Sequence, residues 1–134
     1  MKKYKTLGQL KKDVQVVFNK YIRLRDSGGG YFTCISCGFT QSVDTLNAGH
    51  FFAVKGYDGL RFDEENVNSE CVACNGWNDM HLFGYKKNLI KKIGRKRFLA
   101  LEERAASYKR NGYKWTRSEL EEIKAKYNEL IKEL

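Results

Sequence analysis

Apolar residues recur every three or four positions near the start of the chain, at Leu10, Val14, Val17, Phe18, Tyr21 and Ile22. This spacing places them on one face of an amphipathic helix. Thr6 and Gln9 form a capping box, in which each side chain can pair with the backbone amide of the other residue. Three consecutive glycines after Ser27 are costly to hold in a helix. The pattern therefore predicts an N-terminal helix over residues 6–26.

The middle of the chain has short apolar runs separated by glycines, which is typical of short strands and turns. Residues 31–33 are predicted to form a strand. Residues 45–52 are predicted to form a hairpin centred near Gly49. A helix is expected to start near Cys74, so residues 31–84 should form a small mixed core.

The last part of the chain returns to helical spacing. Residues 85 to about 104 are predicted to continue as one helix, whose apolar stripe consists of Leu89, Ile90 and Ile93. Thr116 and Glu119 form a second capping box, which opens a final helix with apolar positions at Leu120, Ile123, Tyr127, Leu130 and Ile131. Residues 1–134 are thus expected to form one α+β domain, in which residues 85–134 supply a basic helix and a C-terminal helix.

The length of 134 residues and the apolar fraction of 42% allow one domain with a modest core. No stretch reaches the apolar length that spans a bilayer. The basic N-terminus is not followed by an apolar run, so we expect no signal peptide and a protein that stays in the cytoplasm. That compartment is reducing, which disfavours disulfides and favours metal binding as the role of the cysteines.

The four cysteines form two pairs of equal spacing, Cys34 with Cys37 and Cys71 with Cys74. Each pair places two thiolates on one turn, and two such turns complete a tetrahedral zinc site. A redox pair fits less well, because neither pair opens a helix after a long buried strand. Four protein ligands close the metal to water. We therefore predict one structural zinc per chain, which holds the fold and does not catalyse.

His50 lies between the two cysteine pairs. A lone histidine is more often structural than catalytic, but here Asn66 precedes the second pair and Asn75 follows it directly. This is the order and spacing of the HNH, or ββα-metal (His-Me finger), nuclease motif. There the histidine deprotonates a water, the helix residue holds a divalent cation against the scissile phosphate, and the middle asparagine ties the loop together. The motif predicts catalytic roles for His50, Asn66 and Asn75 in a zinc-stapled ββα-metal core with flanking N- and C-terminal helices.

The formal net charge of +9 favours a polyanionic partner. Basic residues concentrate in one short segment without acidic residues, at Lys86, Lys87, Lys91, Lys92, Arg95, Lys96 and Arg97. On a helix they would lie opposite the apolar stripe, where they can reach DNA phosphates. A solvated lysine face with no ligand remains the alternative interpretation of this segment.

Several segments together resemble the NinG (Rap) recombination proteins of lambdoid phages: residues 21–26 (YIRLRD), 34–38, 48–51, 60–62, 71–75 and 85–94. The likeness runs from about Leu10 to the last helix. The zinc, histidine and asparagine core also resembles the phage resolvase endonuclease VII. The resemblance implies endonuclease activity on Holliday junctions and D-loops during phage recombination, with Mg²⁺ or Mn²⁺ as the catalytic cation. It also implies a homodimer, products with 5′-phosphate ends and a location in the host cytoplasm.

The catalytic metal ligands depart from the pattern of these families. Many HNH proteins have an aspartate directly before the histidine, where this chain has Gly49, and the NinG-like pattern has an aspartate at the position of Asn47. An amide is a weaker ligand for a hard cation than a carboxylate. The candidate ligands of the catalytic cation are therefore Asn75, Asn47, Asp79 and His81.

Two other functions share most of these features. A zinc-dependent nucleic-acid-binding module without catalysis would keep the cysteines, but it would not need a histidine and an asparagine at nuclease spacing. An HNH endonuclease that cuts linear duplex DNA would share every catalytic residue. Only substrate tests separate the latter from an enzyme specific for branched DNA.

Overall fold

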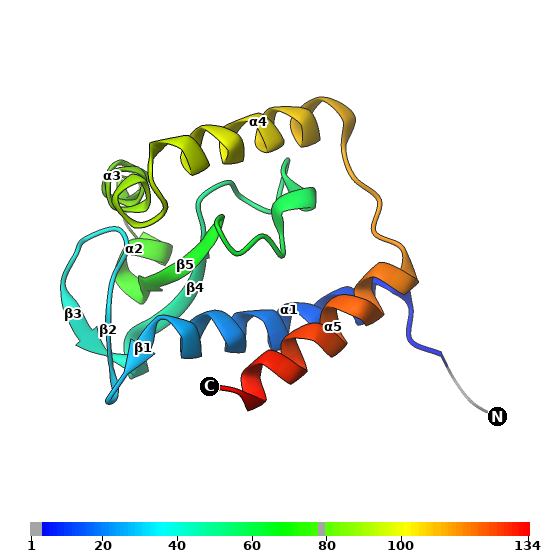
Figure 1. The fold of residues 1–134 in the computed structure, drawn as a ribbon, viewed down its shortest axis with the longest axis horizontal. Coiled ribbons are helices and arrows are strands. Elements are labelled where there is room, and N and C mark those ends of the chain that lie inside the picture. Colours follow the sequence, from blue (N-terminus) through cyan, green and yellow to red (C-terminus); the bar gives the residue numbers. More distant parts are fainter. Residues whose placement is uncertain (1–3, 78–79) are drawn as a thin grey trace.

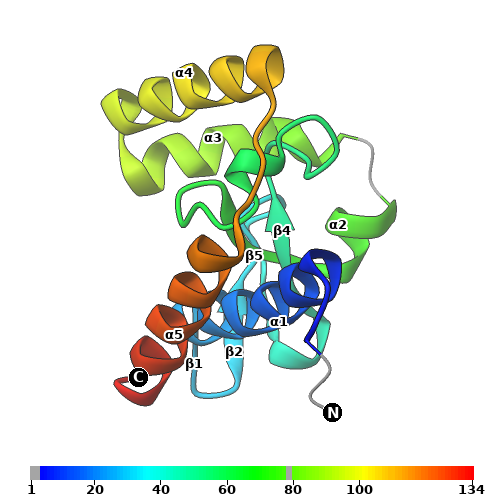
Figure 2. The ribbon, with the colours of Figure 1, turned by 90° about the vertical axis from the view of Figure 1, so that its right-hand side faces the viewer.

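A computed structural model describes residues 4–77 and 80–134, which form a mixed fold of helices and two small sheets (Figure 1). The strands lie between a pair of helices formed by the two ends of the chain and a second pair formed by residues 81–111 (Figures 1 and 2). This architecture confirms the predicted α+β class. No helix in the described ranges is long and apolar enough to cross a membrane.

The two predicted capping boxes both form. Helix α1 (Leu7–Arg25) begins after Thr6, and helix α5 (Arg117–Lys132) begins after Thr116, each with reciprocal side-chain bonds to the backbone. The two helices lie side by side in both views (Figures 1 and 2). Phe18 of α1 meets Tyr127 of α5 edge to face, with ring centroids 4.9 Å apart. Their shared core explains why the apolar stripes at both ends of the chain are buried.

The strands form two separate antiparallel sheets. Strands β1 (Ser27–Gly28), β2 (Tyr31–Thr33) and β3 (Thr40–Ser42) form the first, and a short 3₁₀ turn, η1 (Val43–Thr45), leads out of it. Strands β4 (Leu46–His50) and β5 (Val67–Cys71) form the second. The predicted strand at residues 31–33 is confirmed.

The predicted hairpin within residues 45–52 is wrong. Gly49 lies inside the unbroken strand β4, whose partner is β5, with Leu46 opposite Cys71 and His50 opposite Val67. The reversal is made by the long loop 51–66, which contains the 3₁₀ turn η2 (Asp58–Leu60). A glycine between two apolar runs suggests a turn, but the φ of Gly49 is not positive. A side chain at this position would instead collide with Glu70 of β5.

Three helices follow the second sheet: α2 (Val72–Trp77), α3 (His81–Ile93) and α4 (Arg95–Asn111). The expectation that residues 85 to about 104 continue as one helix is therefore wrong. Gly94 breaks it with φ 87° and ψ 156°, a conformation open almost only to glycine. The break folds α4 back against α3. Both helices bury apolar residues in one cluster together with Leu60 of η2. The other members of this cluster are Tyr85, Leu89, Phe98, Leu101 and Ala105.

Replacing Gly94 with alanine should destabilise the protein. A side chain at this φ and ψ costs about 1–3 kcal/mol, because the surrounding helices fix the conformation. Chemical denaturation would measure the loss. Gly8→Ala is the matched control: Gly8 lies in α1 without a positive φ, and a methyl group there meets only Thr6 Oγ1, at 3.9 Å. The control should be neutral or slightly stabilising, and equal effects of both changes would contradict the role of the break.

Candidate functional site

The four cysteines gather at one place, where β2, β5 and α2 meet. Their Sγ atoms all lie within 4.8 Å of one another. Zinc–sulfur bonds of about 2.3 Å in a tetrahedron separate the sulfurs by about 3.8 Å, so a small adjustment would close this cluster on an ion. The cluster is thus able to hold one zinc ion, which fits the expectation from the paired spacing.

The surroundings of the cluster suit thiolates. The backbone amides of Cys37 and Cys71 both donate to Cys34 Sγ, at 3.4 Å and 3.3 Å. Such amides stabilise the negative charge that a zinc-bound sulfur carries. Phe32 and Leu46 complete a small apolar cluster around the buried cysteines. We refer to the residues 34–37 and 71–74 together as the knuckle.

His50 is the last residue of β4 and is partly buried. Its Nε2 lies 3.0 Å from the carbonyl oxygen of Arg61. Because a carbonyl only accepts, Nε2 carries the proton and Nδ1 keeps its lone pair in the neutral ring. Burial lowers the pKa of His50 below 6.5, helped by the charge of Arg61 and opposed by the carbonyl bond. The histidine is therefore neutral at pH 7, with one nitrogen able to accept a proton.

Asn66 ties the loop 51–66 to itself. Its Oδ1 accepts from the amide of Phe52 at 2.8 Å, and its Nδ2 donates to the carbonyl oxygens of Phe52 and Leu60 at 3.1 Å and 3.3 Å. Its side chain is completely buried. Asn66 therefore has the loop-tying position that the sequence motif predicted, and it acts on the site through the backbone that carries His50 and Arg61.

Tyr85 of α3 is a site residue that sequence reasoning missed. Its ring is fully buried, and its hydroxyl donates to the carbonyl oxygen of Gly49 at 2.7 Å. It also accepts from Nδ2 of Asn68 at 3.2 Å. The hydroxyl thus fixes the backbone directly before His50. A tyrosine on an otherwise apolar helix face gave no signal that its hydroxyl would reach the strand.

The candidate cation ligands are only partly brought together. An ideal Cβ built on Gly49 would lie 3.2 Å from Asn75 Oδ1, so this amide oxygen borders the residue before His50. His81, the first residue of α3, is bonded through Nδ1 to Glu70. Asn47 lies two residues before Gly49 on β4 and is paired with Glu70 of β5. Asp79 lies outside the described residues.

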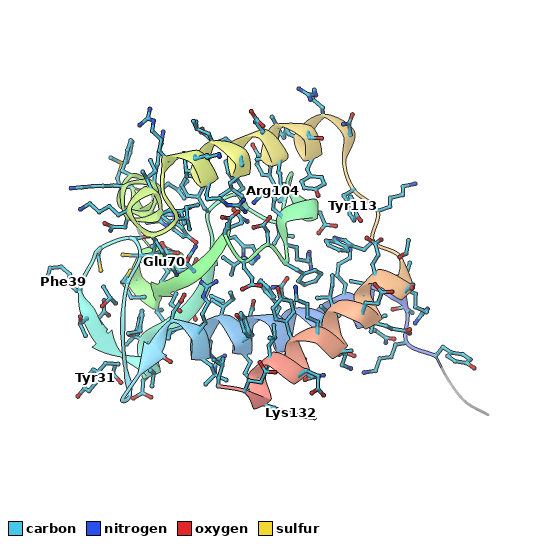
Figure 3. The ribbon with its side chains drawn as sticks, viewed as in Figure 1. Tyr31, Phe39, Glu70, Arg104, Tyr113 and Lys132 are labelled. Atoms are coloured by element: carbon cyan, nitrogen blue, oxygen red, sulfur yellow. The ribbon has the colours of Figure 1, made fainter. Side chains whose placement is uncertain are left out.

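Glu70 of β5 is the second residue that sequence reasoning missed. It is completely buried, lies beneath α3 (Figure 3), and accepts through Oε2 from Ser36 Oγ and His81 Nδ1. Its other oxygen, Oε1, has no hydrogen-bond partner among the described residues. The only signal in the sequence was an acidic residue directly before Cys71. Nothing in the spacing indicated that this strand is buried on both faces.

The predicted DNA-binding residues are exposed, but the helix break divides them. Lys86, Lys87, Lys91 and Lys92 lie on α3, and Arg95, Lys96 and Arg97 open α4. Two of them have acidic or amide partners within the protein. Lys92 donates to Asn68 Oδ1 at 2.6 Å and to Asp26 Oδ1 at 3.1 Å, and Arg97 makes a two-pronged bond to Glu65.

These features define a small α+β protein with a four-cysteine cluster able to hold zinc, packed beside a strand pair that ends in a neutral, partly buried histidine. The family model described as Bacteriophage Lambda NinG protein matches residues 1–134. The chain belongs to the NinG family, which confirms that part of the resemblance seen in the sequence.

The relatives are phage proteins named protein ninG. Those of Escherichia phage 933W and Salmonella phage P22 are each 37% identical over 123 residues, which are 92% of this chain and 57% and 56% of the relatives. That of Escherichia phage lambda is 35% identical over 123 residues, 92% of this chain and 56% of the relative. The chain thus spans little more than half the length of these relatives. No solved structure matches it.

Removing a ligand of the knuckle should unfold the protein. Metal binding free energy contributes directly to folding where the apolar core is small, and the cluster joins β2, β5 and α2. We expect Cys74→Ser to lose bound zinc and cooperative thermal unfolding. Elemental analysis and circular dichroism would measure both. Ser27→Ala, away from the cluster, should retain both, and folded unoxidised wild type without zinc would contradict the prediction.

Proposed function

We propose that this chain is a metal-dependent endonuclease that hydrolyses phosphodiester bonds in branched DNA, such as Holliday junctions and D-loops. The observation that carries the proposal is the state of His50: a neutral imidazole whose Nε2 is held by a backbone carbonyl, which leaves Nδ1 as a base. Asn75 Oδ1 lies near Gly49, the residue directly before His50. An oxygen ligand of a cation that acts beside this base would have such a position. The chain belongs to the NinG family, and the resemblance seen in the sequence implies this activity for that family.

The proposed reaction uses His50 as the general base. Nδ1 takes a proton from a water as the water oxygen attacks the phosphorus and the bond from phosphorus to the 3′ oxygen breaks. The leaving 3′ oxygen takes up a proton from solvent, and the Arg61 carbonyl stabilises the charge that forms on the ring through its bond to Nε2–H. The depressed pKa of His50 keeps the ring unprotonated before each turnover. Tyr85 and Asn66 keep the ring in place, because they fix the backbone on both sides of it.

A divalent cation such as Mg²⁺ or Mn²⁺ would supply Lewis-acid stabilisation of the phosphate oxygens and the leaving oxygen. Asn75 suits this role chemically, since it offers a neutral oxygen at the exposed end of the knuckle. A zinc ion in the knuckle would have four protein ligands and no open position, so its proposed role is confined to holding Asn75 and β5 in place.

The preference for branched DNA rests on the resemblance to recombination proteins and on the charge of the chain. The net charge of +9 suits a partner in which several phosphate backbones converge. A homodimer would place two such sites on opposite strands of a symmetrical junction. The central test is cleavage of a synthetic four-way junction and a linear duplex of the same arm sequence, with Mg²⁺ and with excess chelator.

The outcomes of this test separate the three candidate functions. Junction cleavage that needs Mg²⁺, with the duplex left intact, supports the proposal. Equal cleavage of both substrates indicates an endonuclease for linear DNA. Tight junction binding without cleavage at any Mg²⁺ or Mn²⁺ concentration indicates a binding module and overturns the proposed activity.

His50→Ala should reduce junction cleavage by about 10²–10⁴-fold, the usual contribution of a general base. For the wild type, the single-turnover rate should fall as pH drops through the lowered pKa of His50, because protonation occupies Nδ1. The midpoint of the rise of the rate with pH should therefore lie below 6.5. Zinc content and junction affinity serve as controls and should be unchanged in the variant. A variant that cuts at the wild-type rate would exclude this base.

Removing exposed charges from α3 and α4 should weaken junction binding regardless of sequence. We choose Lys87, Lys91 and Arg95, and we leave out Lys92 because its bonds to Asp26 and Asn68 are structural. The slope of log affinity against log salt should become shallower by up to about 0.9 for each phosphate that the variant no longer neutralises. Fluorescence anisotropy over a salt series measures this slope.

The matched control removes three exposed lysines from the other helix pair, at Lys12, Lys126 and Lys132. It changes the net charge equally, so an effect of overall charge would appear in both variants. Equal weakening in both would show that α3 and α4 are not the DNA-binding surface.

A further inference from the structure

Gly49 is required because another side chain fills the space beside it. An ideal Cβ on Gly49 would lie only 2.3 Å from Oε1 of Glu70 and 3.1 Å from its Cβ, closer than atoms can approach. Glu70 reaches this place from β5, the strand paired with β4. The residue directly before His50 therefore has no side chain of its own, and a carboxylate from the neighbouring strand stands there instead.

The free oxygen of this carboxylate and a second oxygen both lie near the Cβ position of Gly49. Oε1 of Glu70 and Oδ1 of Asn75 lie 2.3 Å and 3.2 Å from the same point, the Cβ position of Gly49. Two oxygens arranged around one point, one charged and one neutral, are the donor set that a hard divalent cation prefers. Asn75 is exposed, so a cation can enter from its side and meet Glu70 within the protein.

The burial of Glu70 makes a partner for Oε1 necessary. The residue is completely buried, and Oε1 has no hydrogen-bond partner among the described residues. A buried carboxylate oxygen without a partner is costly, and native structures rarely leave one unsatisfied. A cation would remove this cost, and no described side chain does so.

The other oxygen is held as a metal ligand would be. Oε2 accepts from Ser36 Oγ, which lies in the turn of the knuckle, and from His81 Nδ1 at the start of α3. Carboxylates that bind metals are generally fixed by such hydrogen bonds through the atom that does not bind. The two donors set the direction of Oε1 and leave it available.

We propose that Glu70 is a ligand of the catalytic cation, binding through Oε1 together with Asn75 Oδ1 beside Gly49. This site rests on the proposed function for its role in catalysis, but the binding of a cation can be tested without DNA. It supplies the carboxylate that positions 47 and 49 of this chain lack. His81 acts through Glu70 as a positioning residue.

Mn²⁺ alone is the probe for this site, added to zinc-loaded protein and followed by calorimetry. Wild type should bind one Mn²⁺ per chain, and Glu70→Gln should bind it at least about tenfold more weakly. Glutamine keeps the size of the side chain and can still pair with Ser36. Glu122→Gln is the matched control, since it removes the same charge from an exposed position on α5 and should have no effect.

A double variant moves the carboxylate to the other strand. In Glu70→Ala/Gly49→Asp the acidic group starts from β4, where the φ of Gly49 suits any residue. We expect it to recover part of the Mn²⁺ affinity that Glu70→Ala loses. Recovery should be incomplete, because Cβ of residue 70 stays 3.1 Å from the new Cβ.

Paramagnetic broadening in ¹⁵N-labelled wild type tests the position without any substitution. Low Mn²⁺ should first broaden the amide signals of Gly49, Glu70 and Asn75. Broadening centred instead on the acidic group Asp63, Glu64 and Glu65 would overturn the proposal, as would wild type that binds no Mn²⁺ or Glu70→Gln that binds it equally well.

The two proposals fail in different ways. If wild type cuts junctions and Glu70→Gln cuts them with the same Mg²⁺ dependence, the nuclease stands and the ligand assignment is wrong. If Mn²⁺ binding depends on Glu70 but no DNA is cut with Mg²⁺ or Mn²⁺, the metal site stands and the proposed nuclease function is wrong.

Discussion

Strand β5 is buried along its whole length, and it contains three consecutive polar residues, Asn68, Ser69 and Glu70. A polar group in such a place costs free energy unless it finds a hydrogen-bond partner, because bulk water does not reach it. The rest of the fold is arranged around this requirement. Arg25 at the end of α1 and Tyr85 of α3 both bond to Asn68, and the amide of Ser69 donates to Asp26. Helices α1 and α3 thereby each have a fixed position relative to β5.

The knuckle and the candidate active site are joined through the same strand. Cys71 ends β5 and precedes α2, while Ser36 of the first cysteine turn bonds to Glu70. A metal ion in the knuckle would therefore fix both the strand that carries Glu70 and the helix that carries Asn75. In the proposed arrangement the two roles would be separated physically: sulfur ligands would enclose the structural ion completely, while oxygen ligands would leave room for a phosphate at the catalytic ion.

Sequence patterns predicted the elements whose signals are local. Both capping boxes could be found, because the residues that form them are three positions apart and pair with each other. The paired cysteines and the loop-tying position of Asn66 could be found for a similar reason, since their spacing is the signal. Features that depend on distant contacts could not. A glycine at helical spacing does not reveal that its φ is positive, as it is at Gly94. Gly49 lacks a side chain because a carboxylate from the neighbouring strand β5 fills the space beside it. Glu70 and Tyr85 are buried because helices α1 and α3 pack against β5.

The pairing of α1 with α5 has a consequence for synthesis on the ribosome. Leu10, Val14 and Phe18 are translated about a hundred residues before Leu120 and Tyr127, which complete the core around them. During that interval Phe62 and Val67 can cover only part of this apolar stripe, and the side that α5 covers in the folded protein stays exposed. We therefore expect chaperones that bind apolar helices to hold the nascent chain until α5 has emerged and covers the stripe.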